Sequence, residues 1–179
     1  PAQLDELSDQ VIDAARVDGI LEVTTARTKE EADSLWAVRK ALSPALRRVA
    51  PKKINEDVVV PVSRIPDLVS ELQRLSAKHR IHIVNFGHAG NGNLHVNLMY
   101  DPADGDQTQR AHACLEGVFA AVLDMQGTIS GEHGIGLVKR DWVGRELDAT
   151  SLRLMRAIKA QFDPDGILNP GKGMPDIAD

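Results

Sequence analysis

Cysteine is almost absent from the sequence, since Cys114 is the only one in 179 residues. A single thiol cannot form an internal disulfide, which excludes a disulfide scaffold and indicates a reducing compartment. The chain also lacks an apolar run near the roughly 20 residues that a membrane helix requires. Its first 18 residues carry five acids where a signal peptide has a positive segment. We therefore expect a cytoplasmic protein without a transmembrane segment.

The charge balance excludes one further class of partner. A formal net charge of −5 argues against nucleic-acid binding. The charge is uneven: residues 1–35 hold nine acids and three bases, whereas residues 36–55 hold six bases and no acid. Such a basic stretch is either a solvated face or a local site for an anion such as a carboxylate. The chain begins on Pro1 directly in a helical pattern, so we expect a piece of a longer protein.

Hydrophobic spacing predicts interleaved helices and strands. Helices are expected from about residue 4 to Gly19, from a T-x-x-E capping box at Thr28 to Ser43-Pro44, and over 65–75, 115–123 and 151–162. Strands are expected over 20–25, 54–60, 81–86 and 94–100. The last two are close enough to pair antiparallel. The sum is an α+β fold, with an antiparallel sheet and flanking helices.

The stretch from Asn85 to Tyr100, NFGHAGNGNLHVNLMY, contains two histidines around a glycine-rich loop. Strand alternation places the apolar side chains of 94, 96 and 98 on one face, and His95, Asn97 and Met99 on the other. The glycines would let His88 and His95 converge, and neutral imidazoles are good ligands for zinc. The alternatives are a hairpin that happens to carry histidines, and a metal or catalytic site.

A second glycine-rich segment, GTISGEHGIG at 127–136, contains Glu132 followed by His133. A carboxylate beside an imidazole suits a metal ligand or a general base, on a backbone that can approach a ligand closely. The alternative is a surface turn in which Glu132 is only solvated. The remaining histidines, His79, His82 and His112, lie on ordinary helix or strand patterns, which favours a structural role.

The segment DPDGILNPGK, 163–172, is rich in turn signals, and is either a coil that ends the last helix or a tail that contacts a ligand. No Walker loop, Rossmann fingerprint or nucleophile elbow is present.

Three motifs together carry a family resemblance. HAGNGNLHVN, GTISGEHGIG and FDPDGILNPGK, in this order, resemble the C-terminal domain of FAD-linked oxidases of the vanillyl-alcohol-oxidase type. This group includes D-lactate, glycolate and D-2-hydroxyglutarate dehydrogenases. LWAVRKALSPAL and KINEDVVVPVSRIP are similar to preceding segments of the same family, so the resemblance runs from about residue 30 to residue 175.

The resemblance implies roles for particular residues. His88, His95 and Glu132 match the ligands of a divalent metal, usually zinc, and His133 matches the general base. The residues that match substrate contacts are Arg39, Ser43, Lys53 and Asn97. Asn169 and Lys172 fall in the tail that approaches the flavin.

The resemblance also implies a function for the whole chain. We expect residues 1–179 to be the C-terminal, ferredoxin-like domain of an FAD-dependent D-2-hydroxy acid dehydrogenase, without its upstream FAD-binding domain. Alone it should bind FAD poorly and be inactive. The expected partners are a small 2-hydroxy acid and an electron-acceptor protein or quinone. An oligomer and peripheral membrane association of the full enzyme are also compatible with the family.

Two other functions fit the residues. One is a self-contained metal-dependent hydrolase that uses His88, His95 and Glu132 with a metal-bound water. The other is a binding or regulatory module that keeps the scaffold without catalysis.

Overall fold

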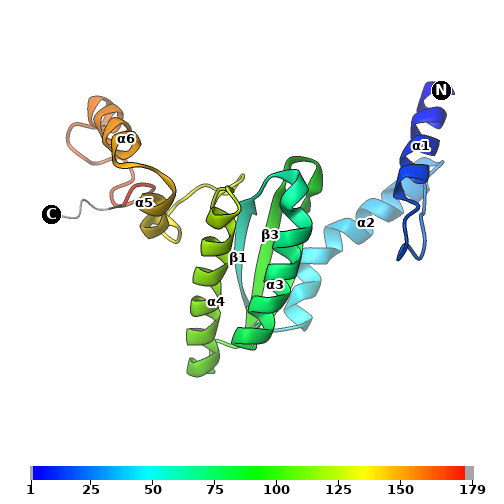
Figure 1. The fold of residues 1–179 in the computed structure, drawn as a ribbon, viewed down its shortest axis with the longest axis horizontal. Coiled ribbons are helices and arrows are strands. Elements are labelled where there is room, and N and C mark those ends of the chain that lie inside the picture. The colour runs from blue at the N-terminus through cyan, green and yellow to red at the C-terminus, as the bar shows by residue number, and fades with distance from the viewer. Residues whose placement is uncertain (1, 176–179) are drawn as a thin grey trace. The chain divides into compact units, whose positions relative to one another are not determined.

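The computed structural model describes residues 2–175, and the chain divides into two compact units, Pro1–Ala45 and Leu46–Asp179 (Figure 1). The first unit contains helices α1, Ala2–Ala15, and α2, Lys29–Ala45. α2 begins at the predicted capping box, where Thr28 Oγ1 accepts a hydrogen bond from the N–H of Glu31 at 3.2 Å, and Glu31 accepts one from the N–H of Thr28. Pro44 lies in the last turn, so the helix ends where the sequence predicts.

The predicted strand over 20–25 is wrong. This stretch has no regular secondary structure, and Leu21 in it is fully exposed. A strand needs a neighbouring backbone to pair with. The two helices of this unit offer none, so a β-favouring composition is not enough.

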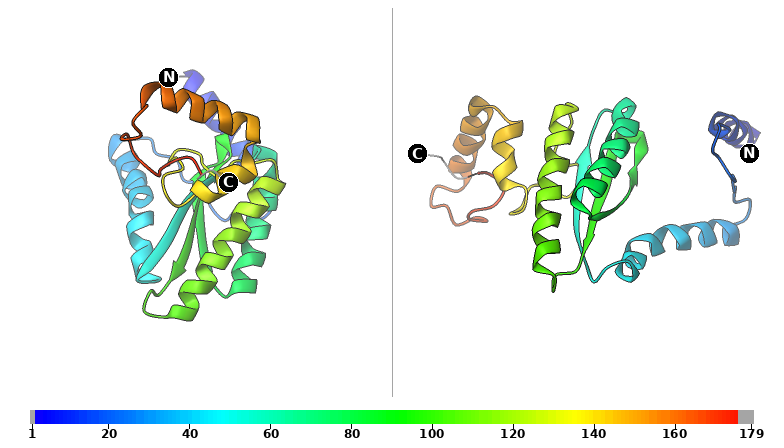
Figure 2. Two further views of the ribbon diagram at one scale, coloured as in Figure 1. Left: turned by 90° about the vertical axis from the view of Figure 1, so that its left-hand side faces the viewer. Right: turned by 60° about the horizontal axis from the view of Figure 1, so that its bottom comes forward.

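The second unit is built on a three-stranded antiparallel sheet of β1, Lys52–Val59, β2, His82–His88, and β3, Asn93–Tyr100, in the order β1-β3-β2. Helix α3, Ile65–His79, connects β1 to β2, and α4, Gly105–Asp124, follows β3. The two helices lie side by side on one face of the sheet (Figure 2). The short α5, Val143–Glu146, and α6, Ala149–Phe162, complete the unit. The α+β class with flanking helices is confirmed.

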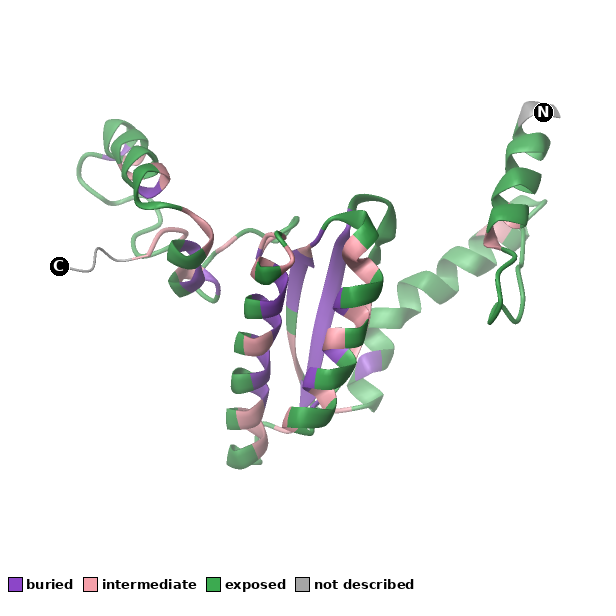
Figure 3. Ribbon diagram, viewed as in Figure 1, coloured by how far each residue is buried: buried purple, intermediate pink, exposed green. Residues whose placement is uncertain are grey.

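The core lies between this sheet and its two helices. Leu94, Val96 and Leu98 of β3 are buried there, as predicted, against Leu72 of α3 and Phe119 of α4. Figure 3 shows that the buried residues of α4 face the sheet while its opposite side is exposed. Asp104 is the N-cap of α4: its side chain accepts a hydrogen bond from the N–H of Gln107, so the helix starts well before the apolar pattern does. None of the helices among residues 2–175 is long and apolar enough to cross a membrane.

The free edge of β1 is where the next part of the chain returns. In a ferredoxin-like β-α-β-β-α-β arrangement a fourth strand would follow α4. Here the returning chain makes a single antiparallel bridge, between Val59 and Thr128. Beyond this bridge the rest of the glycine-rich segment 127–136 does not continue as a strand. Instead, the N–H groups of Gly131 and Glu132 donate hydrogen bonds to the side chain of Asp57 in β1.

Candidate active site

The hairpin between β2 and β3 places two histidines on one face of the sheet. His88 ends β2 and His95 lies in β3, and a tight turn at Ala89–Asn91 joins the strands. The turn ends at Gly92, whose φ of 80° is in the left-handed region that favours glycine. The His88 and His95 ring centroids are 5.5 Å apart at an interplanar angle of 84°. The predicted hairpin therefore exists, and it brings the two imidazoles together.

The segment 127–136 adds Glu132 and His133 to this pair. Glu132 Oε1 lies 3.3 Å from His95 Nε2 and 3.9 Å from His88 Nε2. One donor atom from each of these three residues lies within 4.8 Å of the other two. The ring of His133 stacks on that of His95, with centroids 5.2 Å apart and an interplanar angle of 12°. Glu132 is thus directed at imidazole nitrogens.

The donor set suits a divalent ion. Two imidazole nitrogens and a carboxylate oxygen are a common zinc ligand set, and bonds of about 2.0–2.1 Å in tetrahedral geometry separate two ligand atoms by roughly 3.3 Å. Glu132 Oε1 lies at that separation from His95 Nε2, 3.3 Å, and farther than that from His88 Nε2, 3.9 Å. Burial lowers the pKa of His95, against the opposing effect of the Glu132 carboxylate. A lowered pKa favours the neutral imidazole that a metal ligand must be.

A buried carboxylate that the sequence reasoning missed, Asp57 of β1, lies under this cluster. Its Oδ2 accepts hydrogen bonds from the backbone N–H groups of Gly131, Glu132 and His133, at 2.7, 2.5 and 3.2 Å. Its Oδ1 lies 3.4 Å from Nδ1 of His133 and accepts a hydrogen bond from Lys139 Nζ at 2.7 Å. Both Asp57 and Lys139 are buried.

The electrostatics of Asp57 follow from these partners. Burial by itself would raise the pKa of this carboxyl group, but the hydrogen bonds from Lys139 and from the backbone of residues 132 and 133 outweigh it and lower the pKa to about 2. Asp57 is therefore an anion at neutral pH. A signal for it was present in the sequence, because Glu56 and Asp57 are consecutive acids inside an apolar strand and need buried partners. Lys139 lies in an irregular segment and gave no such signal.

Asn97 and Lys53 form a second polar pair on the same face of the sheet. Lys53 Nζ donates a hydrogen bond to Asn97 Oδ1 at 2.8 Å, and Asn97 Nδ2 donates to the carbonyl of Val84 at 3.0 Å. Burial lowers the pKa of Lys53, and the charge of Arg47 lowers it further. Because Asn97 is buried and both ends of its amide are used, Lys53 is the member of this pair that solvent reaches.

The other predicted residues lie in different places. Arg39 and Ser43 are exposed on α2, in the first unit, at the i and i+4 positions of one helix face. Asn169 and Lys172 lie in the coil after α6. This coil is held to the segment 127–136 by a hydrogen bond from the N–H of Gly173 to the carbonyl of Gly136 at 2.9 Å.

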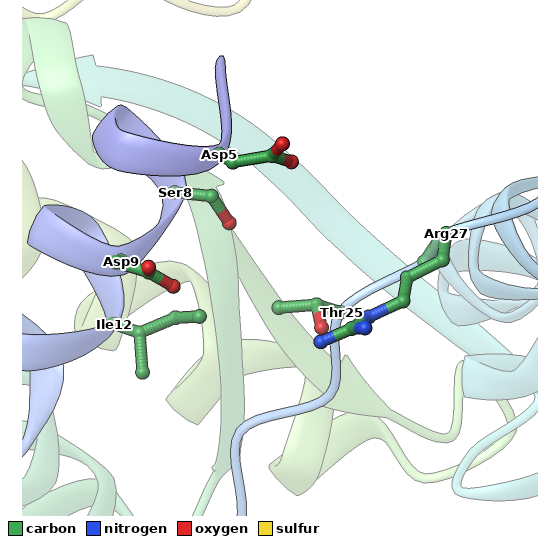
Figure 4. Close-up of a pocket in the computed structure, with 7 residues that line it drawn as sticks. Asp5, Ser8, Asp9, Ile12, Thr25 and Arg27 are labelled. Atoms are coloured by element: carbon green, nitrogen blue, oxygen red, sulfur yellow. The ribbon is translucent and has the colours of Figure 1, made fainter. Parts of the chain in front are cut away.

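Two of the larger hollows in the described surface lie outside the histidine cluster. One, of about 480 Å³, is lined by Lys172 and by apolar side chains that include Ile135 and Met155. The other, of about 470 Å³ in the first unit, lies between α1 and the segment that precedes α2 (Figure 4). It is lined by two carboxylates, Asp5 and Asp9, and by Arg27, and it contains none of the predicted site residues.

Comparisons with known proteins agree with the motifs. The sequence matches the family of FAD linked oxidases, C-terminal domain, over residues 1–173. It is 41% identical over 150 residues to the glycolate oxidase subunit GlcD of Bacillus subtilis, covering 84% of this chain and 32% of that protein. It is 34% identical over 171 residues to the D-lactate dehydrogenase of Anaerostipes hadrus, covering 95% of this chain and 36% of that protein.

A third relative and a solved structure complete the comparison. The D-2-hydroxyglutarate dehydrogenase of Stutzerimonas stutzeri is 34% identical over 157 residues, which cover 86% of this chain and 33% of that protein. The structure of 4-ethylphenol oxidase from Gulosibacter chungangensis has a TM-score of 0.65 at 20% identity over 97% of this chain and 37% of that one, so it supports the fold. The chain spans about a third of the length of these relatives. It belongs to the family of FAD-linked oxidase C-terminal domains.

Proposed function

We propose that this chain is the substrate- and metal-binding part of an FAD-dependent D-2-hydroxy acid dehydrogenase, which oxidises a 2-hydroxy acid to the 2-oxo acid. The observation that carries the proposal is the convergence of His88, His95, Glu132 and His133 from two segments about 40 residues apart in the sequence. The relatives are named as glycolate, D-lactate and D-2-hydroxyglutarate enzymes, which favours this function over a metal-dependent hydrolase.

The metal ligands in this proposal are His88, His95 and Glu132. A divalent ion held there, zinc in the first instance, would act as a Lewis acid on the substrate hydroxyl and lower its pKa. The ring of His95 has two aromatic neighbours: Phe86, edge-on with ring centroids 5.8 Å apart, and His133, stacked with ring centroids 5.2 Å apart. His88 and Glu132 are about half exposed, so substrate can enter from their side.

His133 is the proposed base. Its Nδ1 faces Asp57, and its Nε2 is 3.8 Å from Glu132 Oε1, on the side of the metal ligands. A neutral imidazole in this position can accept the hydroxyl proton of a substrate bound beside the ligands. FAD, held by the rest of the protein, supplies the hydride acceptor when bound. Asn169 and Lys172 are the candidates in this chain for contact with the flavin.

The substrate carboxylate needs a cation. Lys53 is the candidate within the second unit, since its ammonium group is placed by Asn97 on the site face of the sheet. Arg39 and Ser43, on one face of α2, stay proposed substrate contacts on the strength of the sequence motif. A guanidinium holds a carboxylate through two parallel hydrogen bonds, which positions the reacting carbon.

The test uses the full-length protein. We expect a flavin absorption spectrum that bleaches with one or more of D-lactate, glycolate and D-2-hydroxyglutarate, and about one divalent ion per chain. His95→Ala should remove the metal, while His112→Ala, an exposed histidine of α4 outside the site, should retain it. His133→Ala should lower turnover by roughly 10²-fold or more, the range of a positioned base. A metal-free wild-type protein, or wild-type turnover in His133→Ala, would contradict these assignments.

A further inference from the structure

Three successive backbone N–H groups, those of Gly131, Glu132 and His133, converge on one oxygen of Asp57. Such a backbone concavity is an anion-binding nest, which in other proteins receives phosphates or bound anions. Here the anion is a side chain of the same chain. The hydrogen bonds to Asp57 therefore fix the conformation of the backbone that carries the Glu132 and His133 side chains.

The other carboxylate oxygen of Asp57 faces the ring of His133, 3.4 Å from Nδ1. This distance is somewhat longer than a hydrogen bond, as is common for catalytic pairs without substrate. An acceptor beside Nδ1 favours the tautomer with the proton on Nδ1, so that the lone pair of Nε2 faces the metal ligands.

We propose, building on the function proposed above, that Asp57 is a positioning residue for the reaction. One of its oxygens holds the backbone of residues 131–133, and the other sets the orientation and tautomer of the His133 ring. Lys139 keeps the carboxylate in place.

The role of Lys139 follows from its position at the free edge of β1. Its Nζ donates to the backbone carbonyl of Asp57 at 2.9 Å and to the side chain at 2.7 Å, and it lies 3.4 Å from Glu56. It occupies the edge that a fourth strand would pair with. A buried ion pair commonly stabilises a protein no more than an apolar pair of similar size. Stability alone therefore does not explain the buried Asp57–Lys139 pair, whereas a role in holding the loop of residues 131–133 does.

Asparagine at position 57 would separate the two tasks. Its carboxamide oxygen can still accept the three N–H groups, but its NH₂ group must then face Nδ1 of His133 and the ammonium of Lys139. A donor in that place favours the opposite tautomer and repels Lys139. Replacing Lys139 with methionine as well removes the second conflict. Glu56, 3.4 Å from Lys139 Nζ, then loses its cation, but it does so equally in D57N/K139M and in D57A/K139M, so the comparison of these two variants is matched.

The first experiment follows amide hydrogen exchange by mass spectrometry in the full-length protein, and requires neither substrate nor metal. D57A/K139M removes the acceptor, so peptides that contain residues 131–133 should exchange roughly 10-fold faster or more. D57N/K139M keeps the acceptor, so their exchange should stay within about threefold of the wild type. Equal protection in the wild type and D57A/K139M would overturn the role of Asp57 in the loop.

The second experiment measures steady-state kinetics with the best 2-hydroxy acid. For D57N/K139M we expect kcat to fall roughly 10²-fold while KM stays within about threefold of the wild type. The reason is that the loop keeps its place and only the tautomer of His133 is wrong. A kcat within about threefold of the wild type would overturn the tautomer role. If the Asp57–Lys139 ion pair were merely structural, D57N/K139M would have a kcat near the wild-type value, since the two charges of the pair are removed together.

A matched control comes from the same segment. Glu146 accepts a hydrogen bond from the N–H of Ile129 at 3.0 Å, and it contacts neither His133 nor the metal ligands in the part of the chain that is described. Glu146→Ala should leave kcat and the protection of residues 131–133 within about threefold of the wild type. If the wild type oxidises no 2-hydroxy acid, the proposed function fails, while the exchange experiment still decides whether Asp57 holds the loop.

Discussion

The two faces of β3 are buried to a similar extent by different means. On the helix side, Leu94, Val96 and Leu98 are 5% exposed or less and pack against α3 and α4. On the other side, His95 is 7% exposed and Asn97 is fully buried, and both contact mostly polar or aromatic groups. One strand thus separates an apolar core from a polar face that carries the candidate site.

The difference lies in what each face requires of its residues. Apolar contacts are non-directional, so the helix side tolerates substitutions that conserve volume. Hydrogen bonds and ligand sets are directional, so the site face depends on particular atoms. We expect helix-side changes to lower the free energy of unfolding and site-side changes to alter binding and turnover. Substitutions confined to the helix side or to the site side test that separation.

Leu98→Ala should lower the free energy of unfolding by about 3 kcal/mol, because it leaves a cavity in a packed core. Chemical denaturation followed by circular dichroism measures it. Leu154→Ala, at a position of α6 that is 57% exposed, is the control and should change stability little. A loss as small as that of the control would show that the helix side is not the main core.

Gly131→Ala should disturb the site face. An added Cβ would lie 2.7 Å from Asn93 Nδ2 and 2.9 Å from Asp57 Oδ2, both of which are buried, so the loop must move. We expect metal affinity to fall roughly 10-fold or more, the range seen for groups that support metal ligands. Titration of the metal-depleted protein measures it.

Gly144→Ala is the matched control for that change. Gly144 lies in α5 with nothing near the place of an added Cβ, so alanine should be neutral or slightly stabilising. Wild-type metal affinity in Gly131→Ala would mean that the loop does not depend on close packing at that glycine.

Lys53→Met should raise KM for the 2-hydroxy acid about 10-fold with little change in kcat. The substitution removes the proposed charge-assisted hydrogen bond that the Lys53 ammonium donates to the substrate carboxylate. Its neighbour Lys52 is exposed on the same strand, so Lys52→Met controls for the loss of a surface charge. Equal KM values in the two variants would remove Lys53 from the substrate site.

The smallest expected effect is a pH dependence on the helix side. Burial raises the pKa of Cys114 in α4 to about 11, from an ordinary value of 9.0. The folded state keeps the thiol neutral, whereas the unfolded state ionises it above pH 9. The contribution of this thiol to stability is therefore fully present below pH 9 and is lost as the pH rises from 9 towards 11. Between pH 8 and pH 10 the wild type should lose about 1 kcal/mol more stability than Cys114→Ala. Parallel curves for the two proteins would contradict this.

Sequence patterns predicted the elements whose residues act locally. The capping box at Thr28, the alternation in β3 and the glycine-rich hairpin all depend on near neighbours, and the structure has all three. The strand predicted over 20–25 failed because a strand depends on a partner elsewhere in the chain. The apolar stripe of α1 shows the same limit: Leu4, Leu7 and Val11 have helical spacing but stay exposed.

The candidate site divides in the same way. Motifs were enough to name His88, His95, Glu132 and His133, because each lies in a short glycine-rich segment with unusual composition. Asp57 was missed because its partners are more than 70 residues away in the chain.

Contiguous motifs were enough to identify the family and the residue types available for a metal and a base, and hydrophobic spacing was enough for the α+β class. The path of the chain after α4, which leaves the edge of β1 after one bridge, depends on the folded arrangement and cannot be read from any motif. The same is true of the hydrogen bonds that Asp57 makes with Lys139 and with the backbone of residues 131–133. The reason is physical: a buried charge is stable only with partners around it, and those partners are assembled by folding.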